Sequence, residues 1–577
     1  MTGTTNSDRT RRDFLRLGWT LAAGLAVPPI LSGCPGDDDG TATMGPAETF
    51  VEPRILASEN GLLDVTLTFA YLSTVLDGKP VTLRNMFGSI PAPTLRVNAG
   101  DTLRIRVVNQ LPPNPQTNEP TKHLRYPNST NLHTHGLHVT PGTVSPGVFG
   151  DFVMDDPALG VQPGASRQHE YRIGADHPPG AYFYHPHLHG ATALQVGSGM
   201  AGALLVKGAI DKVPEIGAAR ERVFVFQAPV SDANGRLESF SQVTDTPDTE
   251  PPFLVNCVRR PRLVLRRGEV QNWHFVNAGI FRYLNLSLDA HALNVYSFDG
   301  NPRTALKPIG PIAAGDASLP EGVVLAPANR ASVLVQGGAP GTYYLRSLGF
   351  RMDSDAPPIA EDIVAEVVVV DEPLPMALPA GPLPVPPMLA PITDEELANA
   401  GGLKRIIFLA IIFNPPPNAG APIPPITDPP ASNVVHPGDE LADWVYQTDG
   451  TTLANKVFTI GTAGTDASTR PGLPSEYIPF QSARALKQIV ALGSVEEWTI
   501  FNANTIRHPF HIHINPCWVT KVNGKPVEPY WTDTIALPPD GTLTFRSRFA
   551  DFSGAYVMHC HMFAHEDMGM MQTIEVV

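Results

Sequence analysis

The chain has 577 residues, a formal net charge of −15, and many glycines and prolines, 50 and 60 respectively. An acidic chain without an evident basic stripe would be repelled by a phosphate backbone, which argues against nucleic acid as a partner. At ordinary domain size, this length predicts three or four domains.

The N-terminal segment 1–34 has the pattern of an export signal. Arg11 and Arg12 form a twin-arginine pattern ahead of a short apolar run, 17–31, which is too short and too interrupted by glycine and proline for a typical membrane-spanning helix. The run ends in Leu-Ser-Gly-Cys34, which resembles a bacterial lipoprotein cleavage box. We therefore expect a periplasmic or envelope-associated protein with a lipid anchor on Cys34. The alternative is cleavage elsewhere, with Cys34 incidental.

Short runs rich in β-branched and aromatic residues recur along the rest of the chain, and helical periods are few. Examples are residues 101–108, 223–227, 332–336 and 542–549, each bounded by turn residues. This pattern predicts an all-β protein made of sandwiches or barrels.

Composition and the positions of histidine pairs suggest the domain boundaries. A first domain from 50 to 207 contains two histidine pairs, whereas a second from 208 to 371 contains neither a His-X-His nor a His-Cys-His sequence and is expected to be a spacer without metal. The proline-rich segment from 372 to 402 is predicted to be an extended linker. A third domain runs from 403 to 577 and contains the remaining histidine pairs.

A cysteine between two histidines is the most informative feature of the chain. In an extended strand, successive side chains point to opposite faces, so Cys560 faces away from His559 and His561. This tripeptide can therefore serve two metal centres, one on each face of the strand.

The thiolate side of this tripeptide has further ligands nearby. A thiolate, two imidazoles and a weak thioether form the ligand set of a blue-copper electron-transfer site. Cys560, His565 and Met570 supply three of the four ligands. The second imidazole is expected to be that of His508, because Pro509 marks a strand end and leaves His508 free to turn towards this site.

Eight further histidines form four pairs in four separate segments. The two imidazoles of each pair are two residues apart, so they share one face of a strand or of its end. Eight imidazoles divide as two, three and three, the ligand count of a three-copper cluster, although ligand type alone does not exclude zinc or nickel. The pairs are His133 with His135, His185 with His187, His511 with His513, and His559 with His561.

These four segments resemble the four copper motifs of the multicopper oxidases, the laccase-like enzymes. The family's order is kept: His-Thr-His-Gly at 133–136, His-Pro-His at 185–187, His-Pro-Phe-His-Ile-His at 508–513, and His-Cys-His at 559–561 with His565 and Met570 following. Residues 91–103 and 325–330 also resemble family segments of the first and second domains. The resemblance covers roughly residues 50 to 577.

The resemblance implies three cupredoxin-like Greek-key β-sandwich domains and four copper ions. The implied ligands are His508, Cys560, His565 and Met570 for a type 1 copper, His133 and His511 for a type 2 copper, and His135, His185, His187, His513, His559 and His561 for a type 3 pair. Half of the cluster ligands lie in each outer domain, so the cluster is expected at their interface.

The implied activity is one-electron oxidation of a small-molecule reductant, such as a phenol or aromatic amine, coupled to four-electron reduction of dioxygen to water. The alternative within the family is a metallo-oxidase acting on Cu(I), Fe(II) or Mn(II). Two other classes fit less well. A copper-free cupredoxin scaffold of the envelope predicts eroded ligands, and none is eroded. A copper nitrite reductase would lack the complete set of four motifs.

Reduction of dioxygen consumes protons, so an acid must reach the cluster. Glu566, directly after His565, matches an acid that the family places there. A second family acid, expected nine residues after His135, is absent because Val144 occupies that position. The candidate substitutes are Asp151, Asp155 and Asp156.

Four cysteines leave little room for a disulfide framework. Cys34 lies in the signal and Cys560 in the metal motif, so Cys257 and Cys517 are the only remaining pair. A disulfide between them suits an oxidising compartment, and two buried free thiols are the alternative.

Overall fold

The computed structural model describes residues 48–114, 126–155, 160–238, 240–243, 251–311, 321–413, 456–462, 477–478, 480 and 487–577. The export signal with Cys34 lies outside the described residues, as does Asp156, so the predictions for them stay predictions. Within the described ranges, no helix has the length and apolarity needed to cross a membrane.

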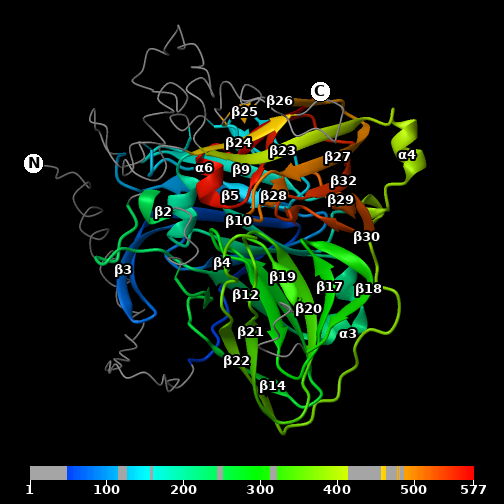
Figure 1. Ribbon diagram of the computed structural model, residues 1–577. Coiled ribbons are helices and arrows are strands. Elements are labelled where there is room, and N and C mark those ends of the chain that lie inside the picture. The colour runs from blue at the N-terminus through cyan, green and yellow to red at the C-terminus, as the bar shows by residue number, and fades with distance from the viewer. Residues whose placement is uncertain are drawn as a thin grey trace, which may run out of the picture. The chain divides into compact units, whose positions relative to one another are not determined.

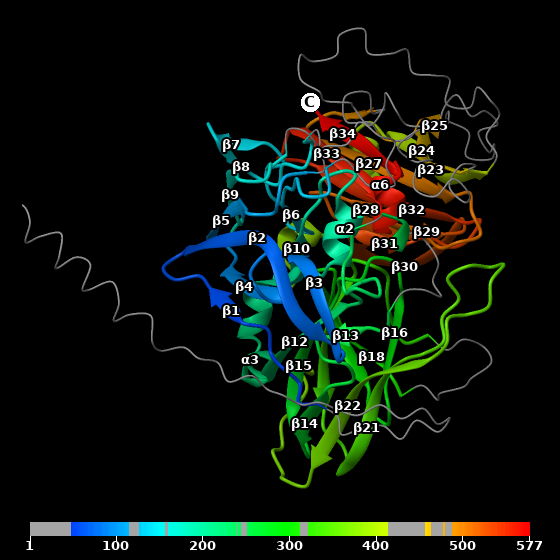
Figure 2. The same ribbon diagram turned by 90° about the vertical axis from the view of Figure 1, so that its left-hand side faces the viewer.

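The described part of the chain is built from strands, which form six sheets (Figures 1 and 2). The prediction of an all-β protein is confirmed. Two sheets come from the N-terminal part. One has the order β1 (Ile55–Ala57), β4 (Ala92–Asn98), β11 (Gly202–Lys207), β10 (Gly180–His185), β6 (His133–His135). The other has the order β3 (Lys79–Asn85), β2 (Leu62–Leu76), β5 (Thr102–Asn109), β9 (Ser166–Arg172), β8 (Val148–Phe149), β7 (Thr143–Ser145).

Two further sheets come from the middle of the chain, drawn in green in Figure 1. The first has the order β13 (Leu254–Val255), β12 (Arg220–Gln227), β15 (Val270–Asn277), β20 (Arg330–Gln336), β17 (Leu293–Phe298), β18 (Asn301–Ile309). The second has the order β14 (Arg262–Arg266), β22 (Asp362–Val370), β21 (Gly341–Ser347), β16 (Leu284–Leu288), β19 (Val323–Leu325).

The last two sheets come from the C-terminal part. One has the order β25 (Tyr477–Ile478), β24 (Lys456–Thr462), β23 (Lys404–Phe413), β27 (Ser494–Asn502), β32 (Thr542–Phe549), β29 (Cys517–Val522), β30 (Lys525–Thr532). The other has the order β26 (Lys487–Val490), β34 (Met571–Val576), β33 (Gly554–Cys560), β28 (Pro509–Ile512), β31 (Thr534–Ala536). Residues 46–577 form one compact unit, so the predicted boundaries at 207 and 371 stay a prediction.

Alternation of apolar and polar residues explains the outer strands. In β5, Leu103, Ile105 and Val107 are completely buried, while Arg104 and Arg106 between them are exposed. Such a strand has one face in the core and one face in water. The central strand β15 differs, because all eight of its residues are buried and both of its faces are covered.

Helices are short in the described residues. They are α2 (Thr192–Gly197), α3 (Pro214–Ala218), α4 (Asp394–Asn399) and α6 (Phe563–Asp567), with 3₁₀ turns η1 (Ala209–Lys212), η2 (Phe240–Gln242) and η3 (Pro387–Leu389). Figure 2 shows α2 close to α6. The carboxylate of Asp567 accepts hydrogen bonds from the backbone nitrogens of Gly190 and Ala193, at 2.6 and 2.7 Å, and so ties the two helices together.

The proline-rich segment from 372 to 402 is not extended throughout. Its second part contains η3 and α4, and the Thr393 hydroxyl caps α4 by accepting a hydrogen bond from the backbone nitrogen of Glu396. Thr393 followed three residues later by Glu396 is a helix-start signature that the sequence contained. Leu389 and Leu397 are buried against Trp531, so this segment packs onto the C-terminal sheets.

Cys257 and Cys517 are free thiols in the structure. Cys517 is buried in the core, and burial raises the pKa of both thiols, that of Cys257 to about 12. The two thiols are therefore free, as the second alternative expected, but only Cys517 is fully buried and Cys257 is partly buried.

Candidate metal centres

A cysteine and two histidines form a buried mononuclear cluster. The Nδ1 atoms of His508 and His565 lie 3.3 and 3.6 Å from the Sγ of Cys560, and all three residues are at most 1% exposed. Met570, also fully buried, is held beside them because its backbone nitrogen donates to the carbonyl of His565 and its carbonyl accepts from the nitrogen of Cys560. The structure therefore brings together the four residues that the sequence suggested.

Local structure explains this convergence. Strand β28 begins at Pro509, so His508 lies just outside the strand, as expected. Phe510 of β28 lies opposite Cys560, the last residue of β33. The chain then turns through α6, which carries His565, and returns as β34 through Gly569, whose φ of +107° is in the region that favours glycine.

The eight histidines of the four pairs lie together in one buried cluster. Two groups of three have ligand nitrogens within 4.8 Å of one another: His135, His185 and His561 in one, and His187, His513 and His559 in the other. The remaining two, His133 and His511, form a third group with His135. This arrangement reproduces the division into two, three and three.

Strand register places histidines from distant segments side by side. His133 in β6 lies opposite His185 in β10, and His511 in β28 lies opposite His559 in β33. The stacked rings of His133 and His513, with centroids 3.9 Å apart, join the N-terminal pair to the C-terminal pair. The cluster is thus shared between the sheets of the two ends of the chain.

The imidazoles are oriented by hydrogen bonds at their outer nitrogens. The Nδ1 of His185 lies 2.8 Å from the carbonyl of Pro186, and the Nδ1 of His511 lies 2.8 Å from the carbonyl of Asp533. In both residues the inner nitrogen, Nε2, has no hydrogen-bond partner, and the same holds for the Nε2 of His133. His135 is reversed, since its Nδ1 faces the Nε2 of His561 at 3.2 Å.

Burial lowers the pKa of cluster histidines, that of His185 to about 3, and neighbouring imidazoles lower several of these values further. The histidines with a lowered pKa are His133, His135, His185, His187, His511, His513 and His561. They are therefore neutral at pH 7, the form that binds metals. A buried polar atom without a hydrogen-bond partner, such as the Nε2 of His133, His185 or His511, destabilises the folded protein. The eight converging side chains are all imidazoles, a ligand type that suits copper, so the residues present fit the metal that the resemblance implies.

Three carboxylates surround this cluster. The Oδ2 of Asp151 lies 2.8 Å from the Nδ1 of His133, and the Oε2 of Glu566 lies 3.1 Å from the Nδ1 of His559. The Oδ1 of Asp533 lies 3.2 Å from the Nε2 of His135. Histidines that bind metals commonly hold a carboxylate or a carbonyl with the other ring nitrogen, which fixes the tautomer.

Asp151, one of the candidates for the acid that is absent at Val144, has its carboxylate beside the cluster histidine His133. Val144 lies in β7, and the hairpin of β7 and β8 turns the chain back so that the backbone nitrogen of Asp151 donates to the carbonyl of Thr140 at 2.9 Å. Asp155 instead pairs with Arg167, at 2.9 Å.

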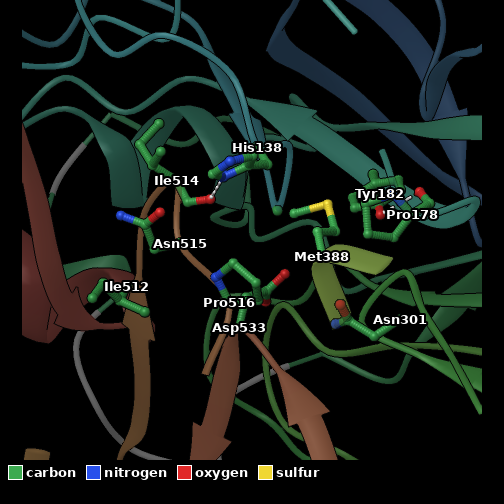
Figure 3. Close-up of a pocket in the computed structure, with 11 residues that line it drawn as sticks. His138, Pro178, Tyr182, Asn301, Met388, Ile512, Ile514, Asn515, Pro516 and Asp533 are labelled. Carbon is green, nitrogen blue, oxygen red and sulfur yellow. Dashed lines mark hydrogen bonds between the residues drawn. The ribbon is translucent and has the colours of Figure 1, made fainter. Parts of the chain in front are cut away.

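His138 and His189 lie close in sequence to the histidine pairs, but neither belongs to the groups of neighbouring ligand atoms. His138 contacts the carbonyl of Ile514 and the carboxylate of Asp551, both at 2.9 Å, as Figure 3 shows for Ile514. His189 packs its ring on Phe480, with centroids 5.1 Å apart.

Sequence reasoning missed Asp533. It lies between β30 and β31, outside every histidine motif, and 398 positions from His135. No local signal marks it, because an aspartate between two threonines at a strand end is common on protein surfaces.

Comparisons with known proteins agree with this geometry. Two family models, both described as multicopper oxidase, match residues 120–210 and 454–577. Laccase-3 of Oryza sativa subsp. japonica is 24% identical over 84% of this chain and 86% of its own, and a laccase of Bacillus stratosphericus is 23% identical over 89% and 94%. Among solved structures, a multicopper oxidase from Campylobacter jejuni described as a metallo-oxidase has a TM-score of 0.65 at 22% identity, covering 92% of this chain and 95% of its own.

The fold and the buried thiolate and imidazole sites define a metalloprotein made of cupredoxin-like sandwiches, and the expectation of three such sandwiches is confirmed. The chain belongs to the multicopper oxidase family. It is an oxidoreductase with copper as cofactor and dioxygen as electron acceptor.

Proposed function

We propose that the protein binds four copper ions and couples one-electron oxidation of a reducing substrate to four-electron reduction of dioxygen to water. The type 1 ligands are His508, Cys560, His565 and Met570. The type 2 ligands are His133 and His511, and the type 3 ligands are His135, His185, His187, His513, His559 and His561. The groups of neighbouring ligand atoms support this assignment.

One observation carries the proposal. Cys560, in the mononuclear cluster, is covalently bonded to His559 and His561, which lie in the two different triads of the eight-histidine cluster. An electron that enters at Cys560 therefore has a short through-bond path to both triads. Copper, when bound, supplies the one-electron redox chemistry, and thiolate with thioether favours its cuprous state.

The protein's own groups hold the ligands and carry protons. Asp151 and Glu566 are buried beside opposite parts of the cluster, one at His133 and the other at His559. We assign both as proton carriers for the reduction of dioxygen. Each also orients the imidazole that it contacts.

Phenols and aromatic amines are the substrates proposed first, since several relatives are laccases. Oxidation of Cu(I), Fe(II) or Mn(II) is the second candidate. The observation that favours it is the burial of His508 and His565, at 0% and 1% exposure, because an aromatic ring cannot contact either imidazole directly. An iron transport multicopper oxidase of Gibberella zeae is 23% identical over 84% of this chain and 71% of its own.

The test follows oxygen uptake by the copper-loaded protein with phenols, aromatic amines and each of the three metal ions. Cys560→Ser is the matched variant. It should lose the intense visible band of a copper–thiolate site and all turnover, yet retain most of the cluster metal. Turnover by Cys560→Ser would contradict the assignment of Cys560 as the electron entry point.

We also propose export by the twin-arginine pathway with lipidation of Cys34. Support comes from the sequence pattern alone. Arg11→Lys with Arg12→Lys should block export and leave the enzyme folded. Metabolic labelling with palmitate tests the anchor separately, and a mature N-terminus other than Cys34 without label would refute lipidation.

A further inference from the structure

A fully buried ion pair lies at the edge of the eight-histidine cluster. The guanidinium of Arg330 donates from Nη1 to Oδ1 and from Nη2 to Oδ2 of Asp533, at 2.8 and 2.6 Å. Arg330 is 0% exposed and Asp533 is 4% exposed. Two parallel bonds between planar groups fix the carboxylate in both position and rotation.

Asp533 contacts two imidazoles, one from each end of the chain. Its Oδ1 lies 3.2 Å from the Nε2 of His135, and its backbone carbonyl lies 2.8 Å from the Nδ1 of His511. Each contact keeps the hydrogen on the outer nitrogen and leaves the lone pair on the inner one, which is Nδ1 in His135 and Nε2 in His511. The hydroxyl of Thr534 lies 3.1 Å from the same Nε2 and donates to the Oδ1 of Asp533 at 2.9 Å. The reversed orientation of His135 therefore depends on where the Asp533 carboxylate and this hydroxyl lie.

Arg330 also connects the middle sheets to strand β10 of the N-terminal sheets. It belongs to β20 of the middle sheets, its Nε donates to the carbonyl of Ala181 in β10, and its guanidinium lies 5.7 Å from the ring centre of Tyr182. Figure 3 shows Tyr182, Asn301 and Asp533, one from each third of the chain, around one pocket. A side chain from sheets that hold no ligand thus reaches the cluster.

A second carboxylate completes the arrangement. The Oδ1 of Asp299 accepts a hydrogen bond from the backbone nitrogen of Arg330 at 2.8 Å, and its Oδ2 accepts from the hydroxyl of Thr532 and from the side chain of Asn329. Thr532 is directly before Asp533. Asp299 therefore holds the backbone of Arg330 and the side chain directly before Asp533.

We propose that Arg330 is a positioning residue for the type 2 side of the copper cluster. Through Asp533 it sets which nitrogen of His511, a proposed type 2 ligand, faces the metal, so the middle sheets control copper occupancy at this site. It also orients His135, a proposed type 3 ligand that lies in the same group of neighbouring ligand atoms as His133 and His511. The inference rests on the proposed function, since it requires a type 2 copper.

The test compares Arg330→Lys with Arg84→Lys. Lysine keeps the charge but lacks the planar fork that holds both oxygens of Asp533. Arg84 is a matched control because it is 1% exposed and bonded to Asn128 and Glu238, with no cluster histidine among these partners. The readouts are the ratio of copper to protein during dialysis against graded chelator, the type 2 signal in electron paramagnetic resonance, the visible band and the melting temperature.

Arg330→Lys should keep the visible band, lose about one copper ion per chain, and bind that ion roughly 10- to 100-fold more weakly, with altered hyperfine splitting of the type 2 signal. Arg84→Lys should lose thermal stability but keep wild-type copper content and signal. Wild-type copper affinity and signal in Arg330→Lys would overturn the proposal.

If Arg330→Lys does not fold, the double variant Arg330→Gln with Asp533→Asn replaces it, because it removes both charges of the Arg330–Asp533 pair together. Asp299, the other carboxylate beside Arg330, keeps its hydrogen bonds from Thr532 and Asn329 in this variant. The double variant is also expected to lose about one copper ion per chain. Wild-type copper content in the double variant would equally overturn the proposal. A wild-type protein that has the visible band but no type 2 signal would instead refute the proposed function.

Discussion

The Oδ2 of Asp151 lies 2.8 Å from the Nδ1 of His133, while the Oδ1 of the same carboxylate accepts a hydrogen bond from the backbone nitrogen of Thr134, also at 2.8 Å. One side chain therefore fixes both the ring and the strand of a cluster histidine. The Oδ2 atom also lies 3.7 Å from the Nδ1 of His513. Asp151 thus connects the N-terminal and C-terminal halves of the cluster.

Asp151→Asn should slow reoxidation of the reduced enzyme by about 10²-fold or more, because an amide cannot carry a proton. The measurement mixes anaerobically reduced protein with oxygen and follows return of the visible band. Asp155→Asn is the control, since Asp155 pairs with Arg167 and contacts no cluster histidine through that pair. Equal slowing in both variants would point to a general structural effect.

Glu566→Gln should slow oxygen reduction more than substrate oxidation. It keeps the shape beside His559 and removes an ionisable group, and acid assistance is typically worth ~10²- to 10⁴-fold. The two half-reactions are timed separately, by bleaching with substrate and by reoxidation. If both proceed at wild-type rates, Glu566 is only a structural neighbour of the ligand.

Gly136→Ala should destabilise the metal-free protein by about 1–3 kcal/mol more than Gly78→Ala does. Both glycines have positive φ, +87° and +74°, so both substitutions carry the same backbone cost. A methyl group at Gly136 would lie 2.5 Å from the Oδ2 of Asp533 and would also meet Arg330, whereas Gly78 faces open space. Chemical unfolding of both variants measures the difference in the free energy of unfolding. Equal losses of stability would show that Arg330 and Asp533 move aside at little cost in free energy.

His177 should make the metal-free protein less stable in acid. Burial lowers its pKa to about 3, and the nearby His138 adds to this effect. Between pH 6.5 and 3, the unfolded chain takes up a proton that the folded protein does not, so the stabilisation is complete above pH 6.5 and is lost as the pH falls.

His177→Gln should therefore be less stable at pH 7 but should lose less stability on acidification, by up to about 1.4 kcal/mol per pH unit. Unfolding free energies at pH 7, 6 and 5 measure how the stability of the variant and of the wild type changes with pH. Parallel slopes for the variant and the wild type would assign the acid sensitivity to other groups.

The proposed copper ligands could be predicted from the sequence because each motif is local. Pro509 marks the start of a strand and leaves His508 just outside it, whereas strand alternation separates Cys560 from the two histidines beside it. The all-β fold followed from equally local signals, and strand β32 has the bounds expected for it.

The supporting groups could not be predicted, because long-range packing brings them to the cluster. Arg330 and Asp533 are 203 positions apart in the sequence, and nothing near either residue marks it as a partner of histidine. Asp151 was one of three open candidates, and only the path of the β7–β8 hairpin distinguishes it from Asp155.

The sharing of one cluster between the two ends of the chain has a consequence for biosynthesis. His511 follows His187 by 324 positions, which at a typical rate of synthesis corresponds to a delay of roughly 15–65 s. During this interval the four N-terminal imidazoles have no C-terminal partners and form an incomplete site that is open to any borderline metal ion, zinc included. The order in which the chain emerges therefore favours loading of copper only after the C-terminal strands have folded onto the first ones.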